Sequence, residues 1–140
     1  MIIKDILQID RLAEQMFGQT DSYIRIDQGD YNRLKTTSAD LNATIVKLTF
    51  NDKVAINQFI DAVKDFGRVG AHEVLLQICV PTGCLDTSNL TINEINLILS
   101  IINEHFGKIN TVWGLSECNE VSADSYDIRV IVGYRNLVVE

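Results

Sequence analysis

Two aspartates three residues apart, Asp27 and Asp30, are the residues whose type and spacing point most directly to chemistry. They lie in the stretch YIRIDQGDYNRL, residues 23–34, with a glycine between them. One interpretation is a helix start, because an N-cap carboxylate and a first-turn carboxylate are each worth about 1 kcal/mol there. The other is a charged loop that is presented to an active site on another protein. The spacing alone leaves both open.

The cysteines and histidines form no pattern of comparable strength. Cys79, Cys84 and Cys118 are an odd set without metal-type pairing, which indicates small buried thiols in a reducing compartment. His72 and His105 lie far apart, and a zinc site of His72, Cys79 and Cys84 would need a fourth ligand to which nothing points. No glycine-rich phosphate loop and no nucleophile motif is present. We therefore expect no cofactor and no metal.

Composition bounds the possible partners. A chain of 140 residues is one domain by length, with 46% hydrophobic and 22% charged residues. The net charge of −7 and the lack of a basic cluster argue against nucleic acid and against an anionic membrane surface. The N-terminal segment is interrupted by charges and is not typical of a signal peptide, and no apolar run is long enough for membrane insertion. We expect a cytoplasmic protein.

Hydrophobic periodicity predicts three helices and four strands. Between the first helix and the first of these strands, YIRI at residues 23–26 could be a short extended piece, and Asp27 could start a short helix as its N-cap. The N-terminal helix ends before Gly18, and Thr91 and Glu94 have the spacing of a capping box. Apolar residues surround most of the helix that follows Thr91, so we expect it to be the more buried one. Helices are predicted over 2–17, from Asp27, over 51–67 and over 91–107, and strands over 43–50, 73–80, 109–117 and 125–135.

This order predicts an α/β fold. Two successive right-handed crossovers place both connecting helices on one face of the sheet. The result is a two-layer sandwich, βαβαββ, with a four-stranded mixed sheet and two helices on one face, preceded by an N-terminal helix. We expect mainly parallel strands and an antiparallel edge, because the short link over 118–124 favours a hairpin between the last two strands.

Several motifs in this half resemble the C-terminal domain of the FtsZ/tubulin family. They are the apolar strand GAHEVLLQICV, the helix start LTINEIN at residues 90–96, and the strand DIRVIV at residues 127–132. Residues 2–17 look like the end of that family's central helix, and residues 23–34 fall where its activating loop, N-x-D-x-x-D, should be. Arg25 stands where the family has asparagine. The resemblance implies an N-terminal helix and acidic loop over 1–42, an FtsZ C-terminal-like domain over 43–140 as a single structural unit, and no GTP-binding domain.

The resemblance also implies a function. In this family the loop enters the nucleotide pocket of the next subunit, where its two carboxylates polarise the attacking water and hold the local cation. The chain would then be an FtsZ-like interaction protein of cell division or the cytoskeleton that binds or caps a full-length FtsZ-like partner. It would not be an enzyme itself, and at most Asp27 and Asp30 would act in trans. The implied interface residues are Arg25, Ile26, Asp27, Gln28, Gly29 and Asp30.

Two alternatives to this function stay open. The chain is also compatible with a self-associating α/β binding module that has lost the cytoskeletal role. It is equally compatible with a fragment excised from a longer FtsZ-like GTPase, so that Met1 would be a boundary rather than the natural start. No arrangement of nucleophile, base and oxyanion-stabilising groups points to an independent enzyme.

Overall fold

A computed structural model describes residues 2–18, 22–50, 52–83, 90–119 and 121–136. Every predicted helix and strand is present, and the expected extended piece before the second helix forms a short strand. The elements in chain order are α1 (Ile6–Phe17), β1 (Ser22–Ile24), α2 (Gln28–Thr37), β2 (Asp40–Thr49), α3 (Ile56–Lys64), β3 (Ala71–Val80), α4 (Ile92–Phe106), β4 (Asn110–Glu117) and β5 (Ser125–Tyr134).

The strands form one mixed sheet in the order β1-β4-β3-β5-β2. Strands β3 and β4 are parallel, whereas β5 runs antiparallel to both of its neighbours, β3 and β2. The predicted α/β class and the four-stranded βαβαββ sheet are confirmed. The short strand β1 extends this sheet at the outer side of β4.

The predicted placement of the last strand is wrong. Strand β5 does not form a hairpin with β4 at an antiparallel edge, but lies inside the sheet between β3 and β2. The reason is its apolar character on both faces: Val130 and Ile131 point to opposite sides, and both are fully buried. A strand of this kind is most stable inside a sheet whose two faces are covered.

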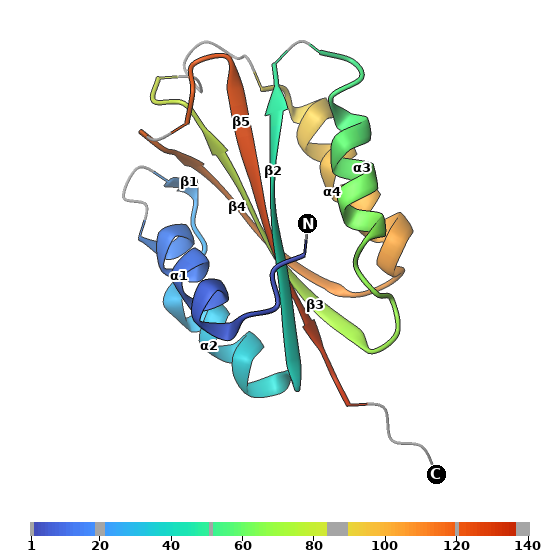
Figure 1. Cartoon of the computed structure of the whole chain (residues 1–140). Coiled ribbons are helices and arrows are strands. Elements are labelled where there is room, and N and C mark those ends of the chain that lie inside the picture. Colours follow the sequence, from blue (N-terminus) through green and yellow to red (C-terminus); the bar gives the residue numbers. More distant parts are fainter. Residues whose placement is uncertain (1, 19–21, 51, 84–89, 120, 137–140) are drawn as a thin grey trace.

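Both faces of the sheet carry helices (Figure 1). Helices α3 and α4 pack together on one face of the sheet. The larger core lies between them and the sheet and includes Phe59, Val63, Ile98 and Ile102. This confirms the predicted sandwich of the sheet with two helices on one face. Helices α1 and α2 cover the other face and add a third layer. Their smaller core joins residues of α1 and α2 to one residue each from β2, β3 and β5.

Helix α1 begins four residues later than predicted. The side chain of Asp5 accepts a hydrogen bond from the Leu7 N–H and caps the helix, so the residues before it are free to run extended. In this extended segment, Ile3 forms two backbone hydrogen bonds with Ala43 at the outer side of β2. The predicted end is confirmed, since the Gly18 N–H bonds the Glu14 carbonyl.

Helix α4 is less buried than its sequence predicts. Thr91 caps it as predicted, because its hydroxyl accepts a hydrogen bond from the Glu94 N–H, and the inner face of the helix buries three isoleucines. The Glu94 side chain contacts the Thr91 hydroxyl at 3.4 Å. Ile92 and Leu97, however, are 76% and 46% exposed. The wide apolar stripe therefore exceeds what the sheet and α3 can cover, and part of it reaches the surface near the start of the helix.

Candidate functional site

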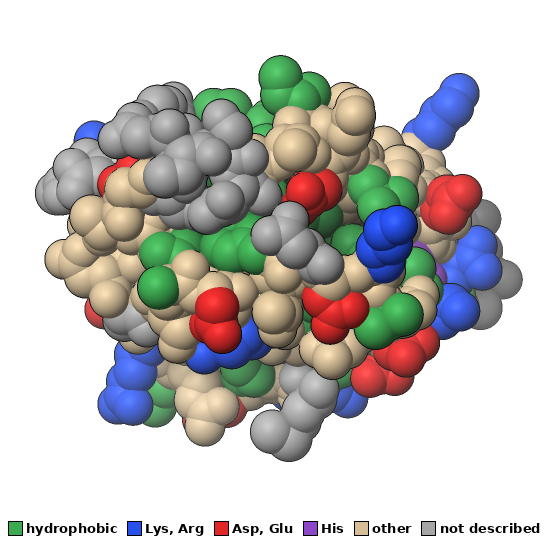
Figure 2. All heavy atoms as spheres, turned by 90° about the horizontal axis from the view of Figure 1, so that it is seen from above, with side chains coloured by type: hydrophobic (Ala, Val, Ile, Leu, Met, Phe, Trp, Pro, Cys, Tyr) green, Lys and Arg blue, Asp and Glu red, His purple; other side chains and the backbone are tan. Residues whose placement is uncertain are grey.

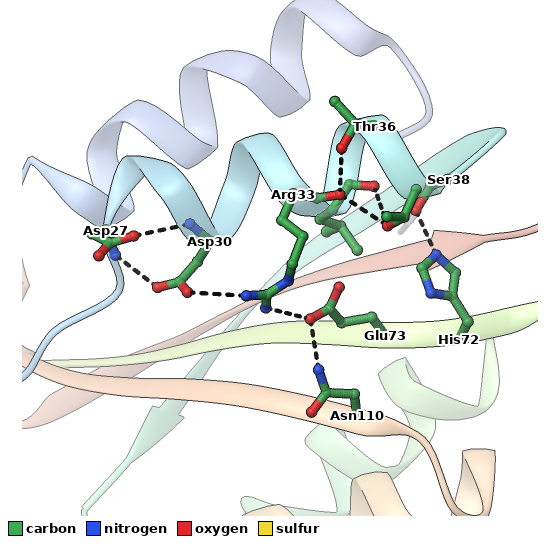
Figure 3. Close-up of polar contacts among 10 residues, drawn as sticks. Asp27, Asp30, Arg33, Thr36, Ser38, His72, Glu73 and Asn110 are labelled. Carbon is green, nitrogen blue, oxygen red and sulfur yellow. Dashed lines mark hydrogen bonds and ion pairs between the residues drawn. The ribbon is translucent and has the colours of Figure 1, made fainter.

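The two aspartates of the opening motif form a capping box at the start of α2. Asp27 Oδ1 accepts a hydrogen bond from the Asp30 N–H at 2.9 Å, and Asp30 Oδ2 accepts one from the Asp27 N–H at 3.0 Å (Figure 3). The predicted N-cap and first-turn positions are confirmed. Because a carboxylate has two oxygens, each side chain uses only one of them for the cap. Capping therefore leaves both aspartates able to accept a further contact.

Near the cap, one buried residue is flanked by exposed ones. Ile26 is 1% exposed and belongs to the core beneath α1 and α2. Arg25, Asp27 and Gln28 are exposed on either side of it, and Asp30 is partly exposed. The buried isoleucine fixes the backbone of the loop, so that the two carboxylates project from a defined position. The structure thus places five of the six predicted interface residues at the surface, and their role at an interface stays a prediction. Ile26 is the exception: it lies in the core and cannot contact a partner in this conformation.

A series of polar contacts connects residues 25–30, the acidic loop, to the sheet. Arg33 Nη1 lies 3.9 Å from Asp30 Oδ1, and Arg33 Nη2 lies 2.6 Å from Glu73 Oε1. Asn110 Nδ2 donates a second hydrogen bond to Glu73 Oε1 at 2.8 Å (Figure 3). Glu73 is only 4% exposed, so its charge needs these two donors. Arg33 therefore lies between the carboxylate of Asp30 and the buried carboxylate of Glu73 near the start of β3.

A second polar contact holds α2 against α1. The Tyr31 hydroxyl donates a hydrogen bond to Asp10 Oδ1 at 2.5 Å, and Lys35 Nζ donates to the same oxygen at 3.0 Å. The hydrogen bond from Tyr31 holds the pKa of Asp10 below its usual value, whereas burial raises the pKa of Tyr31. Asp10 is thus ionised and Tyr31 is neutral around neutral pH, which keeps this contact intact.

The histidine and cysteine candidates do not form a metal site among the described residues. His72 and Cys79 lie on the same strand, seven residues or about 23 Å apart in an extended chain. Cys84 lies outside the described residues. Cys79 and Cys118 are fully buried together, and the hydrogen bond with Cys118 and the burial both raise the pKa of the Cys79 thiol. A protonated, enclosed thiol is a poor nucleophile.

The residues that support the loop were not predicted from the sequence. Arg33 had a visible signal, since it follows Asp30 at the three-residue spacing that brings helical side chains together. Glu73 and Asn110 had none, because they come from two different strands that only the fold brings beside α2. Nor did the pattern reveal that Tyr31 and Asp10 would meet across two helices.

The capping geometry gives a first prediction. Replacing Asp27 with alanine is expected to lower the free energy of unfolding by about 1 kcal/mol, because the Asp30 N–H loses its acceptor. Asp27→Asn should cost much less, since asparagine is an equally good N-cap. Urea denaturation measures both, with exposed Gln28→Ala as the neutral control. Equal midpoints for all three variants would contradict the capping role.

His72 predicts how stability depends on pH. Its ring Nε2 lies 2.8 Å from the Ser38 hydroxyl, and burial, together with the charge of Arg135, lowers its pKa despite the opposite effect of Glu73. A lowered pKa in the folded state means that the unfolded chain binds the proton more readily. Stability should therefore be complete above about pH 6.5 and decline as the pH falls below it. Urea midpoints at pH 7.5 and 5.5 test this, and His72→Gln should show a smaller difference between them.

Within the described residues, no helix has both the length and the apolar character that crossing a bilayer requires. No family model and no curated protein matches the sequence. Among solved structures, the chain is similar to an FtsZ dimer from M. jannaschii, with a TM-score of 0.59 and 14% identity over 81% of this chain and 32% of that chain. The chain therefore shares a fold with part of FtsZ and spans about a third of its length.

Two further solved structures are less similar. A thiamine monophosphate kinase from Aquifex aeolicus has a TM-score of 0.39 and 14% identity over 93% of this chain and 40% of that chain. HypE from E. coli, a hydrogenase maturation protein, has a TM-score of 0.37 and 13% identity over 97% and 46%. Scores this low carry no argument about function.

Proposed function

We propose that this chain is an FtsZ-like interaction protein that contacts the nucleotide face of an FtsZ-like partner through residues 24–34. The observation that carries the proposal is the capping box, which presents two carboxylates on the surface while each keeps an oxygen outside the cap. The fold shared with part of FtsZ and the position of these residues between α1 and β2 support it.

The chemistry of the loop agrees with such a contact. A cation held at a partner's phosphates would meet the outer oxygen of Asp27 and that of Asp30, which also lies 3.9 Å from Arg33 Nη1. The buried Ile26 keeps the backbone that carries them in place. Pre-positioned charge of this kind costs little reorganisation when the partner binds. The chain would contribute acidic groups to a nucleotide site on the partner. Bound in this way, it would cap one end of the partner's filament.

The test uses the full chain and polymerising FtsZ from the same organism. Adding the chain is expected to change both the pelleted polymer and the rate of phosphate release. The double variant Asp27→Asn, Asp30→Asn removes both charges and retains a competent N-cap, so both quantities should return to those of FtsZ alone. Arg25→Asn, which places asparagine where the family has it, should strengthen the effect. Asp40→Asn, at an exposed position at the start of β2, is the matched control.

The outcomes separate the possible explanations. If the wild-type chain in excess changes neither pelleting nor phosphate release, the proposed function is wrong. If the chain has an effect that the double asparagine variant retains in full, the contact does not use the acidic loop. Circular dichroism of each variant shows that the fold is intact before either conclusion is drawn.

A further inference from the structure

A groove separates the start of α3 from the first turns of α4, on the face of the sheet opposite the acidic loop. Its volume is about 550 Å³, which is within the range of sites that hold a small molecule or the side chains of a peptide. One wall is the turn that leads into α3, and the other is the start of α4. The described residues that line the groove are Thr49, Asp52, Lys53, Ala55, Ile56, Glu94, Leu97 and Tyr126.

The apolar surface continues beyond the groove. Leu97, in its lining, is 46% exposed, and Val54, which lies between the lining residues Lys53 and Ala55 in sequence, is 66% exposed. Figure 2 shows this end of the molecule, where hydrophobic side chains reach the surface beside charged ones. Single exposed apolar residues are ordinary, but a half-exposed leucine in a groove, with an exposed valine next to its lining, is typical of a contact surface.

The charges at the groove favour a basic occupant. Asp52 and Glu94 stand on opposite walls, and Lys53 is the one cation among the described lining residues. Burial, and to a lesser extent the charge of Glu94, raise the pKa of Tyr126 to about 12, so its phenol stays neutral. The chain as a whole carries a net charge of −7. A cationic partner is therefore attracted both by the whole chain and by the two walls.

We propose that this groove binds an amphipathic helical segment of a protein partner, with an apolar side chain seated between α3 and α4 and Lys or Arg residues facing Asp52 and Glu94. The groove would supply the apolar pocket, Val54 would widen the contact, and the carboxylates would set the orientation of the helix. A second copy of this chain fits less well, because its own charge of −7 opposes the approach. This surface is separate from the acidic loop and does not depend on the function proposed for it.

The test is a titration followed by NMR of the ¹⁵N-labelled full chain. The probe is a short helical peptide of leucine and lysine, and the control peptide carries glutamate in place of every lysine. We expect saturable shifts of the backbone amides of residues 52–56 and 92–97 with the basic peptide only, and weaker binding at higher salt. Leu97→Gln should raise the Kd about ten-fold, and Glu94→Gln about three-fold.

Val69→Gln is the matched control, because Val69 is 71% exposed before β3, at the opposite end of the sheet. This variant should leave the Kd unchanged. The proposal is overturned if no saturable shift occurs, if the acidic peptide binds equally well, or if Leu97→Gln and Val69→Gln have equal effects. It is also overturned if the groove amides shift with protein concentration alone, since that result would assign the surface to a second copy. The amide spectra of the variants show whether each remains folded.

Discussion

Replacing Leu34 with alanine is expected to lower the free energy of unfolding by about 2–5 kcal/mol. Leu34 is fully buried at the centre of α2 and packs over Gly133 of β5. A Cβ atom placed on Gly133 would lie only 2.5 Å from the Leu34 Cδ1 atom, so the Leu34 side chain fills the space above this glycine. Alanine would leave a cavity there, because the sheet beneath is held by its own hydrogen bonds and cannot collapse into it.

The variant also tests how α2 is held. Urea denaturation gives the change in stability, and hydrogen exchange of the α2 amides shows whether the helix loosens before the sheet does. Asn32→Ala is the matched control, since Asn32 is an exposed residue of the same helix. If Leu34→Ala were no more destabilising than Asn32→Ala, this result would contradict the packing of α2 against the sheet. It would also contradict the fixed position of the acidic loop, which precedes α2.

Local sequence signals predicted the parts of this fold that depend on neighbouring residues. Asp27 with Asp30, and Thr91 with Glu94, form the expected caps, because the side chain and the N–H that it accepts from are three residues apart. Hydrophobic periodicity likewise predicted α1, α3, α4 and the four longer strands, whereas α2 was predicted from its capping aspartates. In these cases the deciding interaction lies within the segment that carries the signal.

The missed features all depend on segments that are distant in sequence. The alternation in residues 125–135 predicted a strand with one face covered and one less so, but which strands it joins depends on how the long connections pack. These place β5 between β3 and β2. The bond between Arg33 and Glu73 spans forty residues. The exposure of Leu97 was missed because periodicity shows which residues are apolar, not how much surface the rest of the fold offers to cover them.

The candidate site shows the same division. The sequence was sufficient to place two carboxylates at a helix start, which is a local property. It did not show that Ile26 would anchor the loop from below, or that Glu73 and Asn110 would hold Arg33 beside Asp30. The position and orientation of the loop, on which any contact with a partner depends, are therefore properties of the fold.

Replacing Gly114 with valine is expected to destabilise the chain by about 3 kcal/mol and to displace the acidic loop. Gly114 lies in β4, directly beneath the chain that enters the loop. A Cβ atom at this position would lie 2.7 Å from the Ile24 carbonyl oxygen and 3.0 Å from the Ile26 Cγ1 atom. Because the first contact is with backbone, no side-chain rotation relieves it, and the segment from Ile24 to Ile26 must move outward.

This displacement links sheet packing to the proposed function. Moving Ile26 out of the core exposes a side chain that is now 1% accessible, and it carries the neighbouring Asp27 away from its place at the start of α2. Hydrogen exchange at residues 24–30 should therefore rise, and the urea midpoint should fall. Gly67→Val is the matched control, because a Cβ atom there meets nothing within 4 Å. Should Gly114→Val keep both the midpoint and the exchange rates of the wild type, the sheet does not position the loop, and the two carboxylates would have to be held by the capping box alone.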